Sequence, residues 1–429
     1  MTKKTSTKSF KSAKSAHAHK DTQLPLLEYM ERLDPVQSAQ TADMLRTVLR
    51  AEPSKDLWPG LICVPPSSLV EQIIIDFQLG TNIPLEIPFF SILSIISGYL
   101  LSKKTTITIQ GDETELYPDI WTILLSESGS SKSLTFNRIK SMDASIQKDV
   151  IFELQGIESS AIFFDLLNDN NERLAYRDEF NEFYKDIQNK TGPLGRLKDF
   201  LLEIYNNTSI SYKTKKEGER TIERPILAFF GQTVTDSFLK YLEADDIVNG
   251  LLQRFAIVHA VKDPSRDPKD FAFYKLQPSK WTKKWNELKN SIKFSNYICD
   301  EYAMEGYVQA FRLLYNYDIP ESFNRRLLWR SHKYALIYHI ICNKGNKQTL
   351  DQEDYGWAGR VISMHLHDMS YILKQYNKSE LQLVTEKCEK VIQRFKDEGK
   401  TIRPRDLIHY VRDIKTAGQA KFLLDVITH

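Results

Sequence analysis

The chain has 429 residues, of which 41% are hydrophobic and 27% charged, and its formal net charge is only +2. This length is enough for two or three domains, and the composition is that of a folded protein with a sizeable core rather than of a polycation. The four cysteines, Cys63, Cys299, Cys342 and Cys388, are far apart and show no CxxC spacing. A disulfide framework and a zinc site are therefore not expected, and a reducing cytoplasmic environment fits best.

The first segment, residues 1–21, is rich in lysine and serine and holds six lysines but no acid in its first twenty residues. It cannot bury apolar surface, so we expect a disordered basic arm. Two interpretations stay open, a solvated tail and an arm that contacts nucleic-acid phosphates. The segment has no apolar stretch of the kind that marks a secretory signal.

Residues 22–115 are predicted to be mostly helical, because apolar positions recur at helical spacing in LPLLEYMERL and SSLVEQIIIDFQL. The most apolar stretch runs from Ile87 to Leu101 and is interrupted by Pro88 and Gly98. It is shorter than a membrane span needs, so we interpret it as a buried helix and expect no membrane partner. Residues 105–110 (TTITIQ) alternate like a strand.

Strand-like and helical segments alternate over residues 116–262, which predicts an α/β core with a mostly parallel sheet. From residue 263 to 381 the strand signal fades, and amphipathic helices are expected to form a lid region. Residues 382–429 are predicted to form a helix-turn-helix or winged-helix-like module, with Pro404 at a helix start.

A candidate phosphate loop follows the apolar run WTILL. The order strand, small-residue loop, Lys-Ser and helix is the arrangement in which backbone N–H groups and a helix N-terminus cradle phosphates. Lys132 is expected to pair with the β- and γ-phosphates of ATP, and the Ser133 hydroxyl to ligate Mg²⁺. The residues predicted to bind the nucleotide are Ser128, Gly129, Ser130, Ser131, Lys132 and Ser133.

The loop departs from the consensus, because Ser126 and Ser131 stand where glycines are usual and only Gly129 remains. Glycine is favoured there since it tolerates unusual backbone angles and lets the ligand approach. The alternative interpretation is a serine-rich turn before an ordinary helix.

An acidic pair ends the next β-prone run, RLAYR, about 45 residues beyond the Lys-Ser pair. Asp178 is expected to hold Mg²⁺, and Glu179 to orient or deprotonate the attacking water. Further on, the apolar strand ILAFFGQT ends in Gln232, a candidate sensor of the γ-phosphate or of the water. An ordinary Asp-Glu pair and a polar strand end are the alternatives.

A basic hairpin is predicted around KTKKEGERT, with Gly218 at the turn. Its cations are suited to the backbone of DNA, and a solvated hairpin with a soluble edge is the alternative. The residues predicted to contact nucleic acid are Lys213, Lys215, Lys216 and Arg220.

Two groups of arginines come later in the chain. Arg254 follows a helix-like stretch and precedes a strand, where it could reach the nucleotide of a neighbouring subunit, and an ordinary surface arginine is the alternative. A second group is Arg325, Arg326, Arg330 and Lys333. It could act as a lid sensor, but we favour a solvated helix face.

The motifs occur together in one order: PDIWTILLSESGSSKS, GIESSAIFFDLL, LAYRDEF, ILAFFGQT, NGLLQRF and RRLLWRSHKYALIYHI. In this order the chain resembles, over about residues 65–375, a P-loop family of formerly unknown function. That family occurs in phages, plasmids and other mobile elements, often fused or adjacent to primases. It is similar to superfamily 3 and other AAA+ replicative helicases.

The resemblance implies an AAA+-like core in a homo-oligomeric ring, expected to be a hexamer, with ATP and Mg²⁺ between subunits. Lys132, Ser133, Asp178, Glu179 and Gln232 would act in cis and Arg254 in trans. The hairpin would face a DNA channel, and a primase is a possible partner. The C-terminal module would read DNA or dock a partner, with candidate phosphate contacts Arg403, Arg405 and Arg412.

Three functions stay open at this point. The first is an ATP-dependent helicase or translocase that acts on single- or double-stranded DNA in the replication of a plasmid or phage-like element. The second is a DNA-binding initiator or scaffold that oligomerises but hardly hydrolyses ATP, because of its degenerate loop. The third is a defence or signalling ATPase with a nucleic-acid sensor.

Overall fold

The computed structural model describes most of the chain from residue 59 onward. The described residues are 59–111, 115–214, 218–242, 250–264, 266–269, 274–315, 319–376, 380–414 and 416–428. The predicted basic arm at residues 1–21 and the helical pattern before residue 59 lie outside them.

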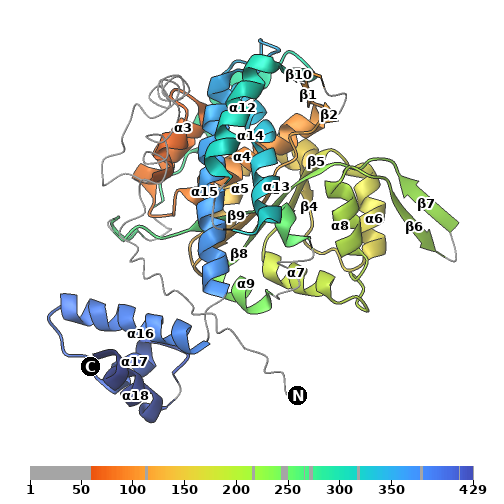
Figure 1. Cartoon of the computed structure of the whole chain (residues 1–429). Coiled ribbons are helices and arrows are strands. Elements are labelled where there is room, and N and C mark those ends of the chain that lie inside the picture. Colours follow the sequence, from red (N-terminus) through yellow and green to blue (C-terminus); the bar gives the residue numbers. More distant parts are fainter. Residues whose placement is uncertain are drawn as a thin grey trace, which may run out of the picture.

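A five-stranded parallel sheet forms the centre of the molecule, in the order β4-β5-β8-β3-β9 (Figure 1). Strand β8 is inserted between β3 and β5, although both precede it in the chain. The prediction of an α/β core with a parallel sheet is confirmed. The strands are β3 (Trp121–Ser126), β4 (Ile151–Glu153), β5 (Arg173–Arg177), β8 (Leu227–Val234) and β9 (Ala256–Ala260).

Successive residues of each central strand point to opposite faces of the sheet, and each face is buried in its own core. In β3, Ile123 and Leu125 belong to one core and Leu124 to the other; in β8, Phe229 and Phe230 divide in the same way. Both faces are covered, which explains why these strands have near-continuous apolar sequences.

Helix α4 (Glu86–Ser102) is the central helix of one face, and its residues from Ile87 to Leu101 are all buried. The prediction of a buried helix is confirmed. Gly98 allows the close approach of α4 to the sheet, since a Cβ there would lie 2.6 Å from Cβ of Leu174 in β5. No helix among the described residues combines the length and apolar character required to cross a bilayer.

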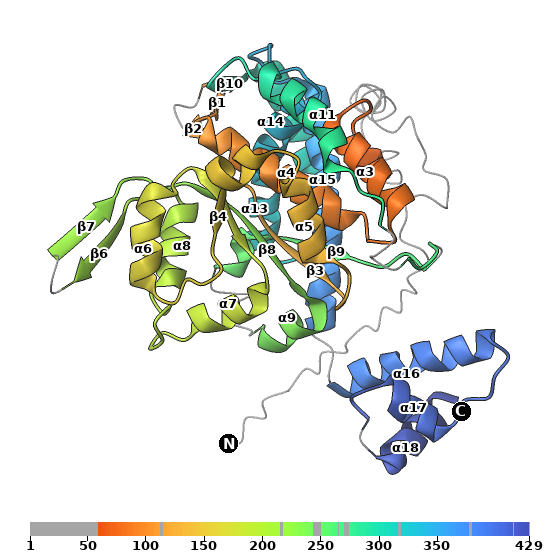
Figure 2. The ribbon, with the colours of Figure 1, turned by 180° about the vertical axis from the view of Figure 1, so that it is seen from behind.

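The remaining helices cover the two faces of the sheet (Figures 1 and 2). Beside α4, the first core holds residues of η1 (Pro59–Cys63), α3 (Leu69–Gly80), α5 (Lys132–Lys140), η2 (Ile146–Val150), α11 (Pro278–Ser291), α12 (Glu301–Leu314), α14 (Ser331–Ile341) and α15 (Gln352–Tyr376). The second core holds residues of α6 (Ser160–Asp169), α7 (Phe180–Gln188), α8 (Leu197–Tyr205), α9 (Thr235–Tyr241), η3 (Leu252–Arg254) and α13 (Glu321–Trp329). The end of α15 also contributes to the second core.

A second, three-stranded sheet joins distant parts of the chain. The predicted strand appears as β1 (Thr106–Ile109), which pairs with β2 (Glu115–Leu116) and, in parallel, with β10 (Asn296–Cys299). Strand β10 was not predicted, because NYIC is short and lies between helices in a region with little strand signal.

Two further units complete the fold. The predicted hairpin consists of β6 (Ile210–Thr214) and β7 (Gly218–Ile222), and it projects from the body beside α6 and α8 (Figures 1 and 2). Helices α16 (Glu380–Asp397), α17 (Pro404–Tyr410) and α18 (Ala417–Thr428) pack around a small core of their own. The described residues of this C-terminal module contain no strand.

Candidate functional site

The loop between β3 and α5, which is the candidate phosphate loop, has an unusual backbone shape. Two of its residues have positive φ angles, 78° at Gly129 and 59° at Ser131. Ser131 directly precedes α5 and adopts the left-handed conformation that favours glycine. The serine found at this consensus glycine position therefore keeps the turn, at a cost in backbone strain.

Hydrogen bonds between residues of the loop stabilise its conformation. The Oγ atoms of Ser126 and Ser130 lie 2.6 Å apart. The ammonium of Lys132 donates to the carbonyl of Glu127 at 3.2 Å and to Ser130 Oγ at 3.4 Å. Burial lowers the pKa of Lys132, and the negative charges of Glu179 and Asp178 oppose that shift. The lysine is therefore held over the loop, close to the acidic pair.

The phosphate loop and the acidic pair, which are 45 residues apart in sequence, meet in space. The hydroxyl of Ser133, in the first turn of α5, donates a short hydrogen bond to Oδ2 of Asp178, which follows β5. The next residue, Glu179, is exposed and has a left-handed backbone with φ of 49°. Its N–H donates to Oδ1 of Asp178 at 3.1 Å.

Gln232 lies between these two elements. It is fully buried in β8, opposite Leu124 of β3, one residue beyond the pairing of Gly231 with Arg177 of β5. Its Oε1 accepts a hydrogen bond of 3.4 Å from the hydroxyl of Tyr176, and its Nε2 has no partner among the described residues. A buried amide nitrogen without a partner is costly unless something else accepts from it.

Sequence reasoning missed Tyr176 and Asn181, which contact Gln232 and Thr233 at the polar end of β8. Tyr176, two positions before Asp178, stacks on Phe136 of α5 with ring centroids 3.9 Å apart. Thr233 donates to Oδ1 of Asn181 at 2.6 Å and so ties β8 to the first turn of α7. No motif marks these residues, because an aromatic strand residue or an Asn near a helix start is usually structural.

The residues present are suited to ATP and Mg²⁺, the groups that the sequence resemblance implies. A serine hydroxyl and a carboxylate are oxygen donors of the kind that Mg²⁺ prefers, and Ser133 and Asp178 are already in contact. The ammonium of Lys132 and the unpartnered amide of Gln232 provide donors for phosphate oxygens.

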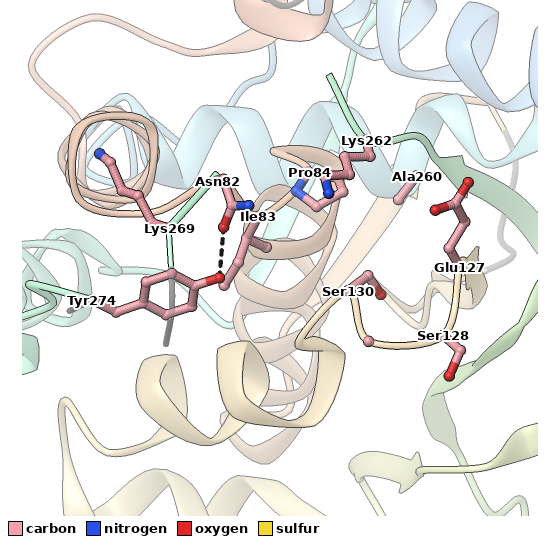
Figure 3. Close-up of a pocket in the computed structure, with 11 residues that line it drawn as sticks. Asn82, Ile83, Pro84, Glu127, Ser128, Ser130, Ala260, Lys262, Lys269 and Tyr274 are labelled. Carbon is pink, nitrogen blue, oxygen red and sulfur yellow. Dashed lines mark hydrogen bonds between the residues drawn. The ribbon is translucent and has the colours of Figure 1, made fainter. Parts of the chain in front are cut away.

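A cavity of about 140 Å³ adjoins the phosphate loop (Figure 3). Residues 127–130 form one wall, and the turn between α3 and α4 forms another, with Asn82 and Pro84. Tyr274 donates to Oδ1 of Asn82 at 2.7 Å, and Lys262 and Lys269 are the cations of the lining. This cavity leaves open space beside the loop.

Arg254 is not part of this site in its own chain. It precedes β9, whose Ala256 pairs with Thr122 near the start of β3, whereas Ala260 pairs with Ser126 at the phosphate-loop end. Arg254 therefore lies at the end of the strands opposite the phosphate loop. Its Nη1 donates to the Gly250 carbonyl at 2.7 Å.

Two of the basic residues that we assigned to a solvated helix face are buried, so that expectation is wrong for them. Arg330 is 1% exposed, at the junction of α13 and α14. Lys333 lies 2.9 Å from the carboxylate of Asp119, which is also buried. Only Arg325, in an ion pair with Glu321, is an exposed residue of the expected kind. Helical periodicity alone did not reveal the buried carboxylate partner.

The basic hairpin is brought neither to the phosphate loop nor to Arg254. Lys213 is exposed, and Lys215 and Lys216 lie outside the described residues. The guanidinium of Arg220 lies 2.7 Å from a carboxylate oxygen of Asp165 in α6, and over the ring of Phe164. Arg220 therefore holds the hairpin to α6, and the nucleic-acid role that we predicted for it stays a prediction.

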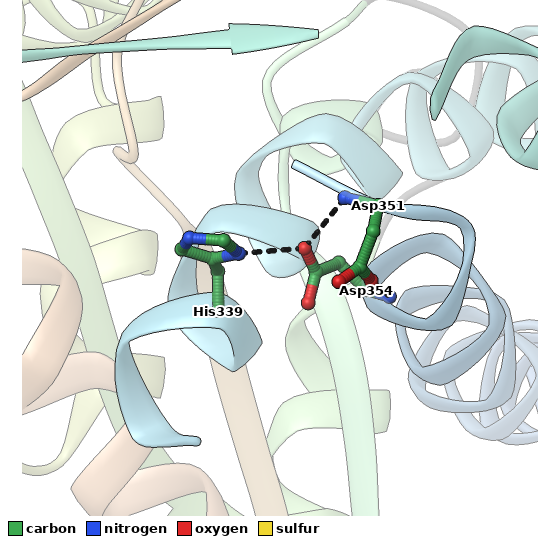
Figure 4. A group of neighbouring side chains, drawn as sticks. All are labelled: His339, Asp351 and Asp354. Atoms are coloured by element: carbon green, nitrogen blue, oxygen red, sulfur yellow. Dashed lines mark hydrogen bonds and ion pairs between the residues drawn. The ribbon is translucent and has the colours of Figure 1, made fainter. Parts of the chain in front are cut away.

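His339, Asp351 and Asp354 form a cluster with the ligand types of a metal site (Figure 4). His339 Nδ1 lies 2.7 Å from Asp354, and its Nε2 lies 3.0 Å from the carbonyl of Lys347. The ammonium of Lys344 contacts both aspartates. Because both ring nitrogens and the carboxylates have protein partners, we interpret this cluster as a structural ion network.

Comparison of the chain with protein-family models and with curated proteins finds no match.

Proposed function

We propose that this protein binds and hydrolyses ATP with Mg²⁺ at the loop after β3, and that it uses the energy to move along or unwind DNA. The observation that carries the proposal is the contact between Ser133 and Asp178. It joins a lysine-serine turn at a helix start to an acidic strand end, which is the pairing that phosphoryl transfer requires.

The residues of the site have separate roles in this proposal. Backbone N–H groups of the loop and Lys132 bind the phosphates, and Ser133 and Asp178 hold Mg²⁺, which neutralises phosphate charge when bound. Glu179 accepts a proton from the attacking water, and Gln232 orients that water or the γ-phosphate. The exposed position of Glu179 leaves its carboxylate accessible to solvent.

The strand order supports an AAA+-like assignment of the core. With β8 inserted between β3 and β5, the polar end of β8 lies between the phosphate loop and the acidic pair. In the proposed ring, Arg254 contacts the nucleotide of a neighbouring subunit, because it lies at the end of the strands opposite its own phosphate loop. Six subunits are the number that the sequence resemblance implies.

DNA binding rests on two features. The hairpin β6–β7 projects from the body and carries Lys213, and the sequence between its two strands contains Lys215 and Lys216. Helices α17 and α18 are separated by residues 411–416, and a pair of helices close in sequence is typical of helix-turn-helix readers. Arg403 and Arg405, at the start of α17, and Arg412, after it, are exposed. Replication of a mobile element, alone or with a primase, is the setting that the resemblance favours.

The test measures binding of a fluorescent ATP analogue, ATP turnover and the unwinding of a duplex with a single-stranded tail. Lys132→Ala is expected to abolish all three. Lys148→Ala, which removes an exposed lysine that precedes β4, serves as the control and is expected to behave as wild type. Undiminished unwinding by Lys132→Ala would contradict the proposal.

A second function, an oligomeric DNA-binding initiator or scaffold with little turnover, is favoured by one observation. Ser131 keeps a strained left-handed backbone, and the ammonium of Lys132 is bonded to its own loop. ATP binding with turnover near background, unchanged by DNA, would select this function over the motor.

A further inference from the structure

Four basic side chains lie at the end of the central strands that is opposite the phosphate loop. Arg254 ends η3, Arg326 lies in α13, Arg330 follows α13, and Lys333 lies in α14. Helix α13 packs on η3, with Phe323 in the same core as Leu251 and Leu252. The segment before β9 and the lid helices thus build this cluster together.

Arg330 fixes the backbone at Arg254. It is 1% exposed, its Nη2 donates a short hydrogen bond to the Arg254 carbonyl, and its guanidinium also hydrogen-bonds the side chain of Tyr205. Arg326 makes the neighbouring contact, with a short hydrogen bond from its Nη1 to Oε1 of Gln253. The two arginines of the lid therefore hold the two residues that lead into Phe255 and β9.

The cluster has more positive than negative charge. Lys333 is paired with Asp119, but within the described parts of the chain no carboxylate forms an ion pair with Arg254, Arg326 or Arg330. Arg254 and Arg326 are both half-buried. Burial lowers the pKa of Arg254, and the charge of Arg326 lowers it further, whereas Tyr205, whose ring centroid lies 5.3 Å from the guanidinium carbon of Arg254, opposes the shift. Like charges that share a partly buried site are stabilised when an anion binds between them.

We propose that Arg254 and Arg326 together bind the triphosphate held by the phosphate loop of a second copy of this chain, and that Arg330 positions Arg254 for it. This inference rests on the proposed ATP site. It adds Arg326 as a second residue that acts in trans, and it gives the lid helices a role in hydrolysis by the neighbouring subunit.

The geometry favours a second copy as the source of the anion. From Thr122 to Ser126 the sheet extends roughly 13 Å, at about 3.3 Å per residue, so one chain cannot bring its arginines to its own loop. Head-to-tail contact of two copies places the arginine end of one against the loop of the next. Such a heterologous contact can repeat and close into a ring.

The decisive experiment mixes two inactive variants. Arg326→Gln retains an intact phosphate loop, and Lys132→Ala retains an intact pair of arginines. Each variant alone is expected to lose ATP turnover, and the loss for Arg326→Gln should be roughly 10³-fold. In an equimolar mixture, about a quarter of the contacts join an intact loop to an intact arginine pair, so about that share of wild-type turnover should return. Arg325→Gln, on the exposed face of the same helix, is the control with unchanged turnover.

Two measurements without turnover accompany the mixture. A fluorescent ATP analogue should bind Arg326→Gln as it binds wild type at chain concentrations too low for assembly. Sedimentation should show an ATP-dependent increase in mass for wild type that is weaker for Arg326→Gln. Arg330→Lys, which keeps the charge, should keep more turnover than Arg330→Met at equal ATP binding, and thermal unfolding of both variants identifies any loss of fold.

The outcomes separate this inference from the proposed function. If Lys132→Ala still binds ATP, the proposed site itself is wrong. If Lys132→Ala loses ATP binding but the co-assembled mixture stays inactive, the inference about the arginine pair is wrong and the ATP site stands. Loss of DNA affinity in Arg326→Gln with normal turnover would show that the cluster binds a DNA phosphate, and would also overturn the inference.

Discussion

The hydroxyl of Tyr176 lies 3.4 Å from Oε1 of Gln232, and this contact leaves Nε2 of the buried amide as the free donor of that side chain. Tyr176 is itself fixed by its stacking on Phe136 of α5. The helix that follows the phosphate loop therefore influences, through one tyrosine, how the amide at the end of β8 is oriented.

Gln232→Leu is expected to lower ATP turnover by roughly 10²-fold, because one donor to the reacting groups is lost. Binding of a fluorescent ATP analogue should change little. Tyr176→Phe is the matched variant, since it keeps the ring stack and removes only the hydroxyl, and its loss of turnover should be smaller. Wild-type turnover in Gln232→Leu would exclude a role for this amide in the reaction.

Ser131→Gly should stabilise the protein by about 1 kcal/mol, because a serine with φ of 59° pays a steric penalty that glycine avoids. The gain is measured as the free energy of urea unfolding. Gly129→Ala, at φ of 78°, should change it in the opposite direction. A strong rise in turnover of Ser131→Gly would identify a motor slowed by its loop, whereas stabilisation without turnover would favour the scaffold.

Lys333→Met is expected to destabilise the fold by about 3–5 kcal/mol, because it leaves the buried carboxylate of Asp119 without its partner. The double variant Lys333→Met with Asp119→Leu should recover part of this loss, since neither buried charge remains. Arg325→Gln, which breaks only an exposed pair, should stay within about 0.5 kcal/mol of wild type. Equal stability of Lys333→Met and Arg325→Gln would contradict the buried pairing.

Stability is predicted to fall in mild acid because of two buried histidines. Burial lowers the pKa of His332 and of His365 to about 3, from an ordinary value of 6.5. Below pH 6.5 the unfolded chain therefore takes up protons that the folded chain excludes, so folding stability decreases as the pH falls towards 3. The loss should be about 1.4 kcal/mol per pH unit for each histidine.

Urea unfolding between pH 6 and pH 4 measures this dependence. His365, whose Nδ1 lies 3.0 Å from the carbonyl of Ile257, is the residue to replace. His365→Gln should reduce the slope of stability against pH by the share of one histidine, even though it also lowers stability at every pH. His409→Gln, which replaces an exposed histidine, should leave the slope unchanged.

Much of the core could be predicted because local patterns agree with the tertiary structure. The apolar run WTILL forms a buried strand, the Lys-Ser pair begins a helix, and the alternating TTITIQ forms β1. The contact between Ser133 and Asp178 was expected from the motifs, because a Lys-Ser pair after one strand and an acidic pair after a later strand are the residue types that hold Mg²⁺ beside a phosphate loop.

The remaining features depend on long-range partners that one sequence does not reveal. Strand β10 exists because β1 is available to pair with it, and Lys333 is buried because Asp119 lies opposite. In the same way, the pairing of Arg220 with Asp165 was not foreseen, since a cation on a hairpin is usually solvated. Hydrophobic periodicity indicates which side of a helix is apolar, but it does not reveal a buried residue of opposite charge elsewhere in the chain.

The parallel pairing of Thr106 with Asn296 has a consequence for biosynthesis. While the ribosome is still making the central sheet, β1 lacks one of its two neighbours, because that neighbour is nearly 190 residues away along the chain. A nascent chain must therefore keep an open strand edge until this late segment has left the exit tunnel. This delay makes the early part of the protein a candidate client for chaperones during translation.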